Sequence, residues 1–328
     1  MYKNIFKVGS ITLLIKPLGY VRDIFIASLS GISFYSDVLY FTLRIPFAFK
    51  TIFSSPYQAA FIPIFLNLKN VDESRAINHA LTVFIISIII SMPLLVVIEI
   101  NMDSIISFCN FDFIQGQKNH DFTVLIARII LPYLLFILLS ATLLSILYSY
   151  EKFVLGSLLP IIINILSIFT LFMSQNLDTD KIIIFLSISI VFGSIVEVII
   201  LFFYLRKNIS IRKFKFIKTD LNKFFKLLIP SISNDVIYQG TKFINVIYAA
   251  ALVGGISSLY FASIVAALPI AIFGVTLSTV LIPKLSSLYI SDKQKKINLI
   301  KDSLRLALLL ILPTVAFLFF FSELLLSS

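Results

Sequence analysis

The chain has 328 residues, of which 59% are hydrophobic, 13% are charged and none is tryptophan, and its mean hydropathy is +1.02. A soluble domain of this composition would expose most of its apolar surface, so the sequence predicts an all-α integral membrane protein. The net charge of +10 belongs mainly to loops, where basic residues meet anionic membrane lipids. We therefore expect those lipids as partners and expect no nucleic acid.

Nine segments are long and apolar enough to cross a hydrocarbon core of about 30 Å, which needs about 20 residues of helix. They are residues 8–29, 33–67, 77–100, 122–149, 153–173, 182–205, 227–251, 256–286 and 303–327. Cys109, His79 and His120 have no metal-ligand spacing, so neither a metal nor another cofactor is expected. The two histidines lie near segment ends and are expected at the membrane interface.

Basic residues predict the orientation. With a cytoplasmic N-terminus, nineteen Lys and Arg residues fall in inside segments and only Lys118 and Lys181 fall outside. By the positive-inside rule this asymmetry predicts a cytoplasmic N-terminus and a C-terminus near the outer face. The first segment carries no small-residue cleavage site, so it is expected to be a retained span.

The longest basic stretch, residues 206–226, divides six predicted spans from three. We expect an N-terminal six-helix lobe (1–205), a basic cytoplasmic linker (206–226) and a partial second lobe (227–328). Residues 27–49 can be laid on residues 250–273, which matches Gly31 with Gly254 or Gly255 and Pro46 with Pro269. This similarity predicts a parallel repeat about an axis along the membrane normal.

Ionised side chains interrupt the first two predicted spans, among them Lys16, Arg22, Asp23, Arg44 and Lys50. A charge at bilayer depth costs roughly 2.5 to 3.5 kcal/mol, so such residues are kept where they face a polar cavity or one another. The excess of cations predicts transport of an anion. Pro17 removes a backbone donor and Gly19 loosens the same turn, so the first helix is expected to be bent or unwound there. On an unbroken helix Lys16 and Arg22 would point about 120° apart, so either the cavity is wide or the break rotates them together.

These residues belong to a longer series of motifs. In chain order it comprises Lys16-Pro17-Leu18-Gly19-Tyr20-Val21-Arg22-Asp23, Ser36-Asp37, Arg44-Ile45-Pro46, Lys50, Gln58-Ala59-Ala60-Phe61-Ile62-Pro63, Asn164, Leu268-Pro269 and Phe273-Gly274-Val275. The series resembles the MurJ/MviN family, the lipid II flippases of the multidrug/oligosaccharidyl-lipid/polysaccharide (MOP) exporter superfamily. The resemblance covers the whole chain but only about two thirds of the fourteen-span family fold.

The resemblance implies a MOP-type flippase fold in the bacterial cytoplasmic (inner) membrane. It implies alternating access of two lobes that move lipid II, an undecaprenyl-pyrophosphate-linked glycolipid, between the leaflets. Arg22, Lys50 and Lys16 would hold the pyrophosphate. Asp23 and Asp37 would close a gate or orient an arginine, and Arg44 would line the same cavity.

The chain also departs from the family pattern. Lys16 and Lys50 replace arginines, which keeps the charge but loses the forked contact. The family's charged residues in the eighth span read Ser263, Ile264 and Ala267, and its acidic residue in the seventh span reads Asn245. Lys242 stands where an aliphatic residue is usual. Its ammonium is expected either to approach the cavity from the second lobe, in place of the charge missing at Ile264, or to extend to the outer membrane interface.

Three functions follow from these observations. The first is lipid II flipping, which is expected to be complete only with further helices from a second polypeptide. The others are export of another lipid-linked oligosaccharide and a non-transporting remnant or interaction protein of the same fold. An enzyme is not expected, because the sequence has no catalytic constellation and Glu197 lies alone in its predicted span.

Overall fold

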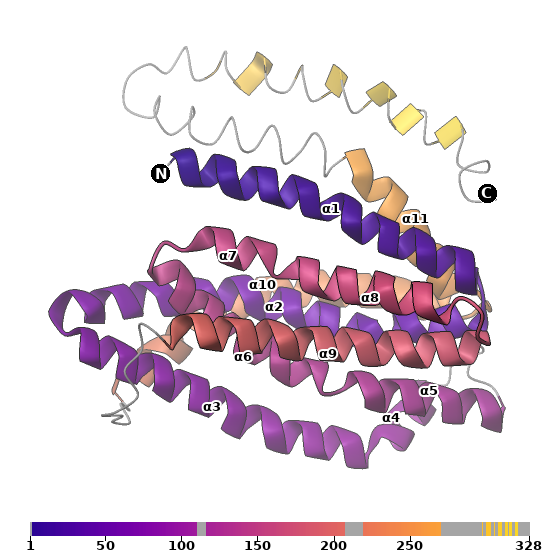
Figure 1. Cartoon of the computed structure of the whole chain (residues 1–328), viewed down its shortest axis with the longest axis horizontal. Coiled ribbons are helices and arrows are strands. Elements are labelled where there is room, and N and C mark those ends of the chain that lie inside the picture. The colour runs from indigo at the N-terminus through magenta and orange to yellow at the C-terminus, as the bar shows by residue number, and fades with distance from the viewer. Residues whose placement is uncertain are drawn as a thin grey trace. The chain divides into compact units, whose positions relative to one another are not determined.

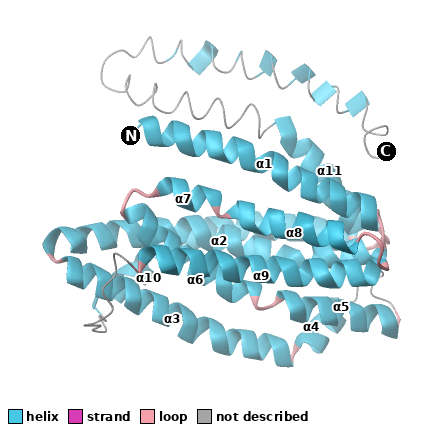
Figure 2. Ribbon diagram, viewed as in Figure 1, coloured by secondary structure: helices cyan, strands magenta, loops and turns pink. Residues whose placement is uncertain are grey.

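The computed structural model describes residues 2–109, 116–206 and 219–269, together with isolated helical positions between 297 and 320. Every element in these ranges is a helix (Figures 1 and 2), which confirms the all-α class. The elements are α1 (Tyr2–Ser30), α2 (Phe34–Val71), α3 (Glu73–Ile100), α4 (Met102–Cys109), α5 (Gln117–Ile130), α6 (Tyr133–Ser149), α7 (Phe153–Leu158), α8 (Pro160–Ser174), α9 (Thr179–Leu205), α10 (Thr219–Ala249) and α11 (Gly255–Pro269).

Four described stretches are long and apolar enough to cross a membrane: Glu73–Ile100, Gln117–Ser149, Phe153–Ser174 and Thr179–Leu205. They coincide with the third to sixth predicted segments. The first, second and seventh predicted segments correspond to α1, α2 and α10. Most of the linker and the later part of the eighth predicted segment lie outside the described residues, and the ninth is described only at isolated positions.

Two compact units divide the chain, one formed by Ser10–Ser257 and the other by Met1–Gly9 with Ser258–Ser328. The first unit holds most of the described residues. Within it α6 packs against α2, α3 and α9, and α10 packs along α2 (Figure 1). The predicted lobe boundary at residues 206–226 stays a prediction.

An aromatic core fills the first unit between α2, α3 and α6. Phe61 and Phe65 are fully buried, and their ring centroids lie 5.6 Å apart. The His79 ring stacks on Phe61 at 5.7 Å and is 0% exposed. His79 lies two turns into α3 and its ring is part of the aromatic core, so it packs inside the bundle, and its expected position at the membrane interface stays a prediction.

The proline-containing helices are continuous. α1 remains helical through Pro17, and α2 through Pro46, Pro56 and Pro63. The predicted unwinding beside Pro17 does not occur. Pro17 removes one backbone hydrogen-bond donor, and the helix continues past it. Lys16 and Arg22 consequently point about 120° apart around α1.

Left-handed glycines precede two helices at equivalent places. Gly31 (φ +59°) lies between α1 and α2, and Gly254 (φ +82°) lies between α10 and α11. Such a backbone conformation favours glycine because it has no Cβ. A Cβ at Gly254 would also clash with the Ile32 side chain. This shared feature supports the predicted repeat and pairs Gly31 with Gly254 rather than with Gly255.

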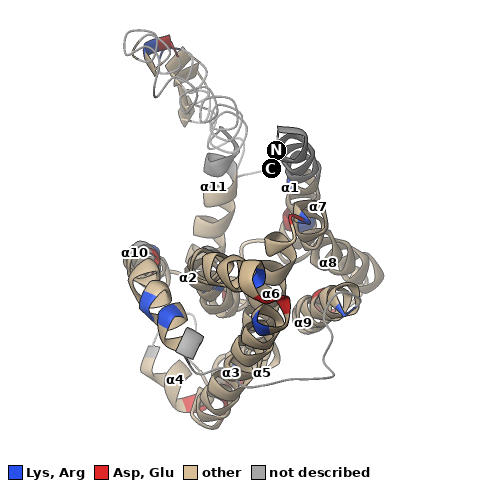
Figure 3. Cartoon of the chain, turned by 90° about the vertical axis from the view of Figure 1, so that its left-hand side faces the viewer, with Lys and Arg blue, Asp and Glu red and all other residues tan. Residues whose placement is uncertain are grey.

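Basic loops meet at one end of the first unit. The Lys69 ammonium lies 3.8 Å from the centre of the Tyr150 ring, and the Tyr150 hydroxyl donates to Glu73 at 3.2 Å. Burial and the Glu73 carboxylate raise the pKa of Tyr150 to about 12, so its hydroxyl stays protonated and can donate. Figure 3 views this end, where Lys and Arg positions on α10 are also visible.

Aromatic and charged contacts join the loops at the opposite end. Phe34 at the start of α2 packs on Phe122 in α5, with ring centroids 6.0 Å apart. Arg128 and Glu99 form an ion pair at 3.4 Å. The α2–α3 and α6–α7 connections thus lie at one end of the unit and the α1–α2 connection at the other (Figure 1).

Candidate functional site

Arg22 on α1 is held from two directions. Its Nε and Nη2 donate to Asp23 Oδ1 at 3.0 and 2.7 Å, and its Nη1 donates to Asn164 Oδ1 on α8 at 3.1 Å. The two charged side chains are 16% and 11% exposed. A carboxylate and an amide on different helices therefore fix the plane of the guanidinium. Asp23 orients Arg22, which is one of the two roles that the resemblance implies for it.

Lys50 belongs to a second polar group, where α2, α6 and α9 meet. Its ammonium interacts electrostatically with the Tyr133 hydroxyl on α6 and with the Glu197 carboxylate on α9. Tyr133 and Glu197 are only 3% and 5% exposed, and Lys50 is partly buried. A carboxylate at this depth needs a counter-charge, and Lys50 provides it. The expectation that Glu197 lies alone holds within its own helix but is wrong for the folded chain.

Asp37 on α2 binds the first turn of α11. Its Oδ1 accepts from the Ser257 backbone N–H at 2.7 Å and from the Ser257 hydroxyl at 2.8 Å, and its Oδ2 accepts from the Gly254 N–H. Asp37 and Ser257 are both 0% exposed. A carboxylate is favoured at a helix N-terminus, where backbone N–H groups lack intrahelical partners. The partners of Asp37 are thus neutral donors rather than an arginine.

Arg44 and Lys242 meet through the backbone. Arg44 Nη2 on α2 donates to the Lys242 carbonyl oxygen on α10 at 3.3 Å. Both side chains are partly buried, as is that of Lys16 on α1. Six of the predicted site residues are therefore spread over three polar groups, centred on Arg22, Lys50 and Asp37, and the contact between Arg44 and Lys242, and Lys16 belongs to none of these.

Neutral residues occupy the positions at which the family carries charge. The Ser263 hydroxyl donates to the Leu259 carbonyl at 2.6 Å, so this hydrogen bond stays within α11. Asn245 on α10 is exposed, and the side chain of Ala267 lies outside the described part of the chain.

Sequence reasoning did not assign site roles to Asn164, Glu197 and Ser257. An ionisable residue inside an apolar span is a signal by itself, so Glu197 could have been proposed as the partner of a buried cation. The roles of Asn164 and Ser257 depend on which helices meet, and although Asn164 belongs to the series of motifs, no local pattern pairs it with Arg22.

Comparison with known proteins identifies relatives along almost the whole chain. The family described as lipid II flippase MurJ matches residues 26–328. A probable lipid II flippase MurJ of Buchnera aphidicola subsp. Schizaphis graminum is 29% identical over 98% of this chain, and one of Rickettsia prowazekii is 28% identical over 92%. The match covers 63% and 60% of the lengths of these relatives. The chain thus spans less than two thirds of the relatives that it matches.

Solved structures give the same family and fold. The lipid II flippase MurJ in an inward closed conformation is 26% identical, with a TM-score of 0.78 over 96% of this chain and 65% of that one. An inward-facing multidrug resistance MATE family transporter of the MOP superfamily is 15% identical, with a TM-score of 0.74 over 97% of this chain and 74% of that one. The predicted MOP-type fold is confirmed, and a family of flippases agrees with the expectation that the chain is not an enzyme. The chain is a multi-pass bacterial membrane protein that belongs to the lipid II flippase MurJ family.

Proposed function

We propose that this chain takes part in moving a polyprenyl-diphosphate-linked glycolipid, of the lipid II class, between the leaflets of the bacterial cytoplasmic membrane. The observation that carries this proposal is the oriented guanidinium of Arg22, held by Asp23 and Asn164 within an apolar helical bundle. The name of the relatives, lipid II flippase MurJ, gives the substrate class.

A diphosphate suits these cations. It carries two or more negative charges, and arginine contacts phosphate oxygens through two parallel N–H bonds, whereas lysine acts as a point charge. Arg22 is held in place before a ligand arrives, so binding orders little further. Lys50 and Lys16 supply further positive charge, and Arg44 and Lys242 would contribute from the contact between α2 and α10.

Alternating access requires that a contact across the bundle breaks in each cycle. We propose the Asp37 clamp, formed by Asp37 with Gly254 and Ser257, as that contact. It joins α2 of the predicted first lobe (1–205) to the start of α11 in the predicted second lobe (227–328). Releasing it would let the two lobes rock about the linker at 206–226.

The proposal places the N-terminus in the cytoplasm. The contacts between Lys69, Glu73 and Tyr150 support it, because they gather basic loops at one end of the bundle. Single cysteines at Ser174 and Lys213, in a Cys109→Ser background, should be labelled from opposite sides, Ser174 from outside. Labelling of both from the same side would contradict this orientation.

Translocation is tested in liposomes. Together with a polypeptide that supplies further helices, the purified chain should flip fluorescent lipid II, and Arg22→Lys should slow flipping because the forked contact is lost. Export of another lipid-linked oligosaccharide is the second candidate, favoured by Ser263 and Ile264 in place of charged residues. A comparison of lipid II with a second undecaprenyl-diphosphate-linked oligosaccharide distinguishes the two.

Two further results would change the proposed function. Flipping of neither lipid would support the non-transporting remnant. Flipping by the chain free of other proteins would contradict the expected need for a second polypeptide.

A further inference from the structure

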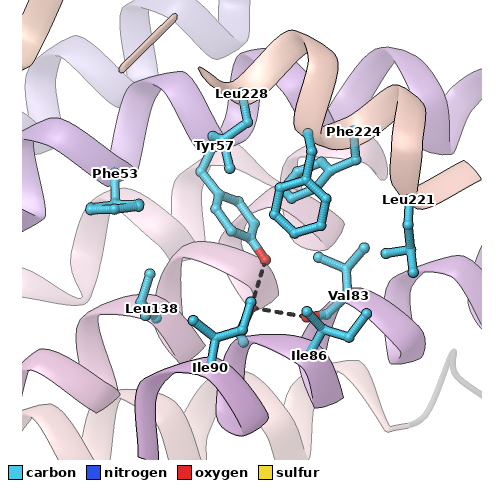
Figure 4. A pocket seen from close by; sticks show the side chains of 11 residues that line it. Phe53, Tyr57, Val83, Ile86, Ile90, Leu138, Leu221, Phe224 and Leu228 are labelled. Carbon is cyan, nitrogen blue, oxygen red and sulfur yellow. Dashed lines mark hydrogen bonds between the residues drawn. The ribbon is translucent and has the colours of Figure 1, made fainter. Parts of the chain in front are cut away.

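An apolar pocket lies between α2, α3, α6 and α10 in the first unit (Figure 4). Its volume is about 120 Å³, and its lining includes Phe53, Tyr57, Ile86, Leu138 and Phe224. An apolar cavity of roughly 150 Å³ stays dry and takes up benzene, so a space of this size holds a hydrocarbon group of a few carbons.

The polar groups in the lining already have partners. The Tyr57 hydroxyl lies 2.6 Å from Thr142 Oγ1 and 3.1 Å from Ser87 Oγ. Figure 4 marks the contact between Tyr57 and Ser87 with a dashed line. Ser87 and Thr142 in turn donate to backbone carbonyls of their own helices, at 2.9 and 3.1 Å. A water molecule needs two to four polar partners, and these groups are engaged with one another. The pocket therefore favours hydrocarbon over water.

The position of the pocket relates it to the cationic site. Lys50, Phe53 and Tyr57 follow one another at spacings of three and four residues on α2, so they lie on one stripe of that helix. Tyr57 is about 10 Å further along the axis than Lys50. A diphosphate held at Lys50 would bring the first carbons of its lipid chain alongside Phe53 and into the pocket.

We infer that this pocket binds the diphosphate-proximal isoprene unit of the polyprenyl chain while the diphosphate occupies the Lys50 site. The inference rests on the proposed function and deepens it, because it gives the protein a contact that recognises the lipid as a prenyl diphosphate. Of the hydrocarbons that could fill the pocket, a prenyl chain carries its diphosphate directly on its first carbon. The acyl tail of a phospholipid is separated from its phosphate by glycerol and an ester, which would place polar groups in the apolar stretch beside Phe53.

The test compares geranyl diphosphate with inorganic diphosphate as ligands of the purified full chain. The wild type should bind geranyl diphosphate about tenfold or more tightly than inorganic diphosphate, because filling an apolar site is worth at least that factor. Ile86→Phe, which fills the pocket, should abolish this preference and leave the affinity for inorganic diphosphate unchanged.

Ile90→Phe serves as a second filling variant that folds easily, because Ile90 lines the pocket and is 55% exposed. The matched control is Ile89→Phe on the same helix, which is 60% exposed at a position outside the lining and should behave as wild type.

Each outcome separates the two proposals. Wild-type chain that binds neither ligand contradicts the proposed function. A preference for geranyl diphosphate that persists in both filling variants overturns the pocket inference alone. Native mass spectrometry that shows a phospholipid retained by the wild type and lost from Ile86→Phe, with the preference intact, would assign the pocket to a phospholipid tail and also overturn the inference.

Discussion

The helix pairs α1–α2 and α10–α11 share a left-handed glycine between their helices but differ in what they contribute to the polar contacts. The first pair contributes charged side chains, Asp37 and Arg44, to the contacts between the pairs. The second contributes neutral groups: the Lys242 carbonyl, the N–H groups of Gly254 and Ser257, and the Ser257 hydroxyl. The two pairs thus share a backbone feature and differ in charge.

The difference bears on how the two pairs could separate. A buried ion pair leaves two uncompensated charges when it opens, which is costly. The Asp37 clamp leaves one carboxylate and a helix N-terminus, both of which water can solvate. A contact between a charge and neutral donors is therefore suited to repeated opening. The following variants test whether the contact between the pairs depends on charged side chains of the first pair and on backbone groups of the second.

The largest effect is expected at Arg22. Arg22→Ala combined with Asp23→Asn removes both charges of the pair, so no buried charge is left without a partner. We expect diphosphate affinity to fall by about a hundredfold, the size expected for a charge-assisted bidentate contact of about 3 kcal/mol. Titration of the purified chain with geranyl diphosphate measures it.

Asp23→Asn alone is the control for Arg22. It keeps the cation and removes its competing carboxylate, so binding should be retained. If the double variant binds as tightly as wild type, Arg22 has no part in the anion site and the proposed function loses its main support.

Asp37→Ala should open the contact between α2 and α11. It leaves three donors without their carboxylate, and hydrogen bonds to charged groups contribute about 1.5 to 3 kcal/mol each. Ile256 is 3% exposed in this contact. A cysteine at Ile256, in the Cys109→Ser background, should react with a soluble maleimide at least about tenfold faster when Asp37 is absent.

Ser257→Ala gives the graded comparison for the clamp. It removes only the hydroxyl donor and keeps both N–H groups, so the alkylation rate should rise by much less. Equal rates in Asp37→Ala and wild type would show that the clamp does not hold the two helices together.

Glu197→Gln should strengthen anion binding by about three- to tenfold, because the diphosphate no longer competes with a carboxylate for Lys50. The same variant should lower the melting temperature, since the Lys50 charge loses its buried partner. Glu99→Gln is the matched control, because Glu99 pairs with Arg128 at the opposite end and is 46% exposed. Weaker anion binding in Glu197→Gln would mean that Glu197 positions Lys50 instead of competing for it.

Sequence alone predicted the features that depend on local composition. Hydropathy gave the all-α membrane class and the segments that became α3, α5–α6, α7–α8 and α9. Motifs in the first sixty residues named the family. The charged residues of α1 and α2 were recognisable because ionised side chains are rare in apolar segments.

Partners across the bundle could not be predicted. Asn164 lies 142 residues from Arg22, and Ser257 lies 220 residues from Asp37. Which residues meet depends on helix packing, to which one sequence offers no guide. His79 illustrates the same limit: its place near a segment end suggested an interface, and its stacking on Phe61 was not predictable.

The smallest effect is expected at Lys242, the one basic residue of the predicted span at 227–251. Lys242→Leu removes the ammonium but keeps the backbone carbonyl that accepts from Arg44, so the packing of α2 on α10 should survive. If its charge reaches the anion, affinity for geranyl diphosphate should fall about two- to threefold at low salt, and the difference should vanish at high salt through screening. Arg44→Leu provides the contrast, because it removes the donor of that contact and should weaken both packing and binding. An affinity that Lys242→Leu leaves unchanged at low salt would exclude the Lys242 charge from the site and leave the second pair contributing backbone alone.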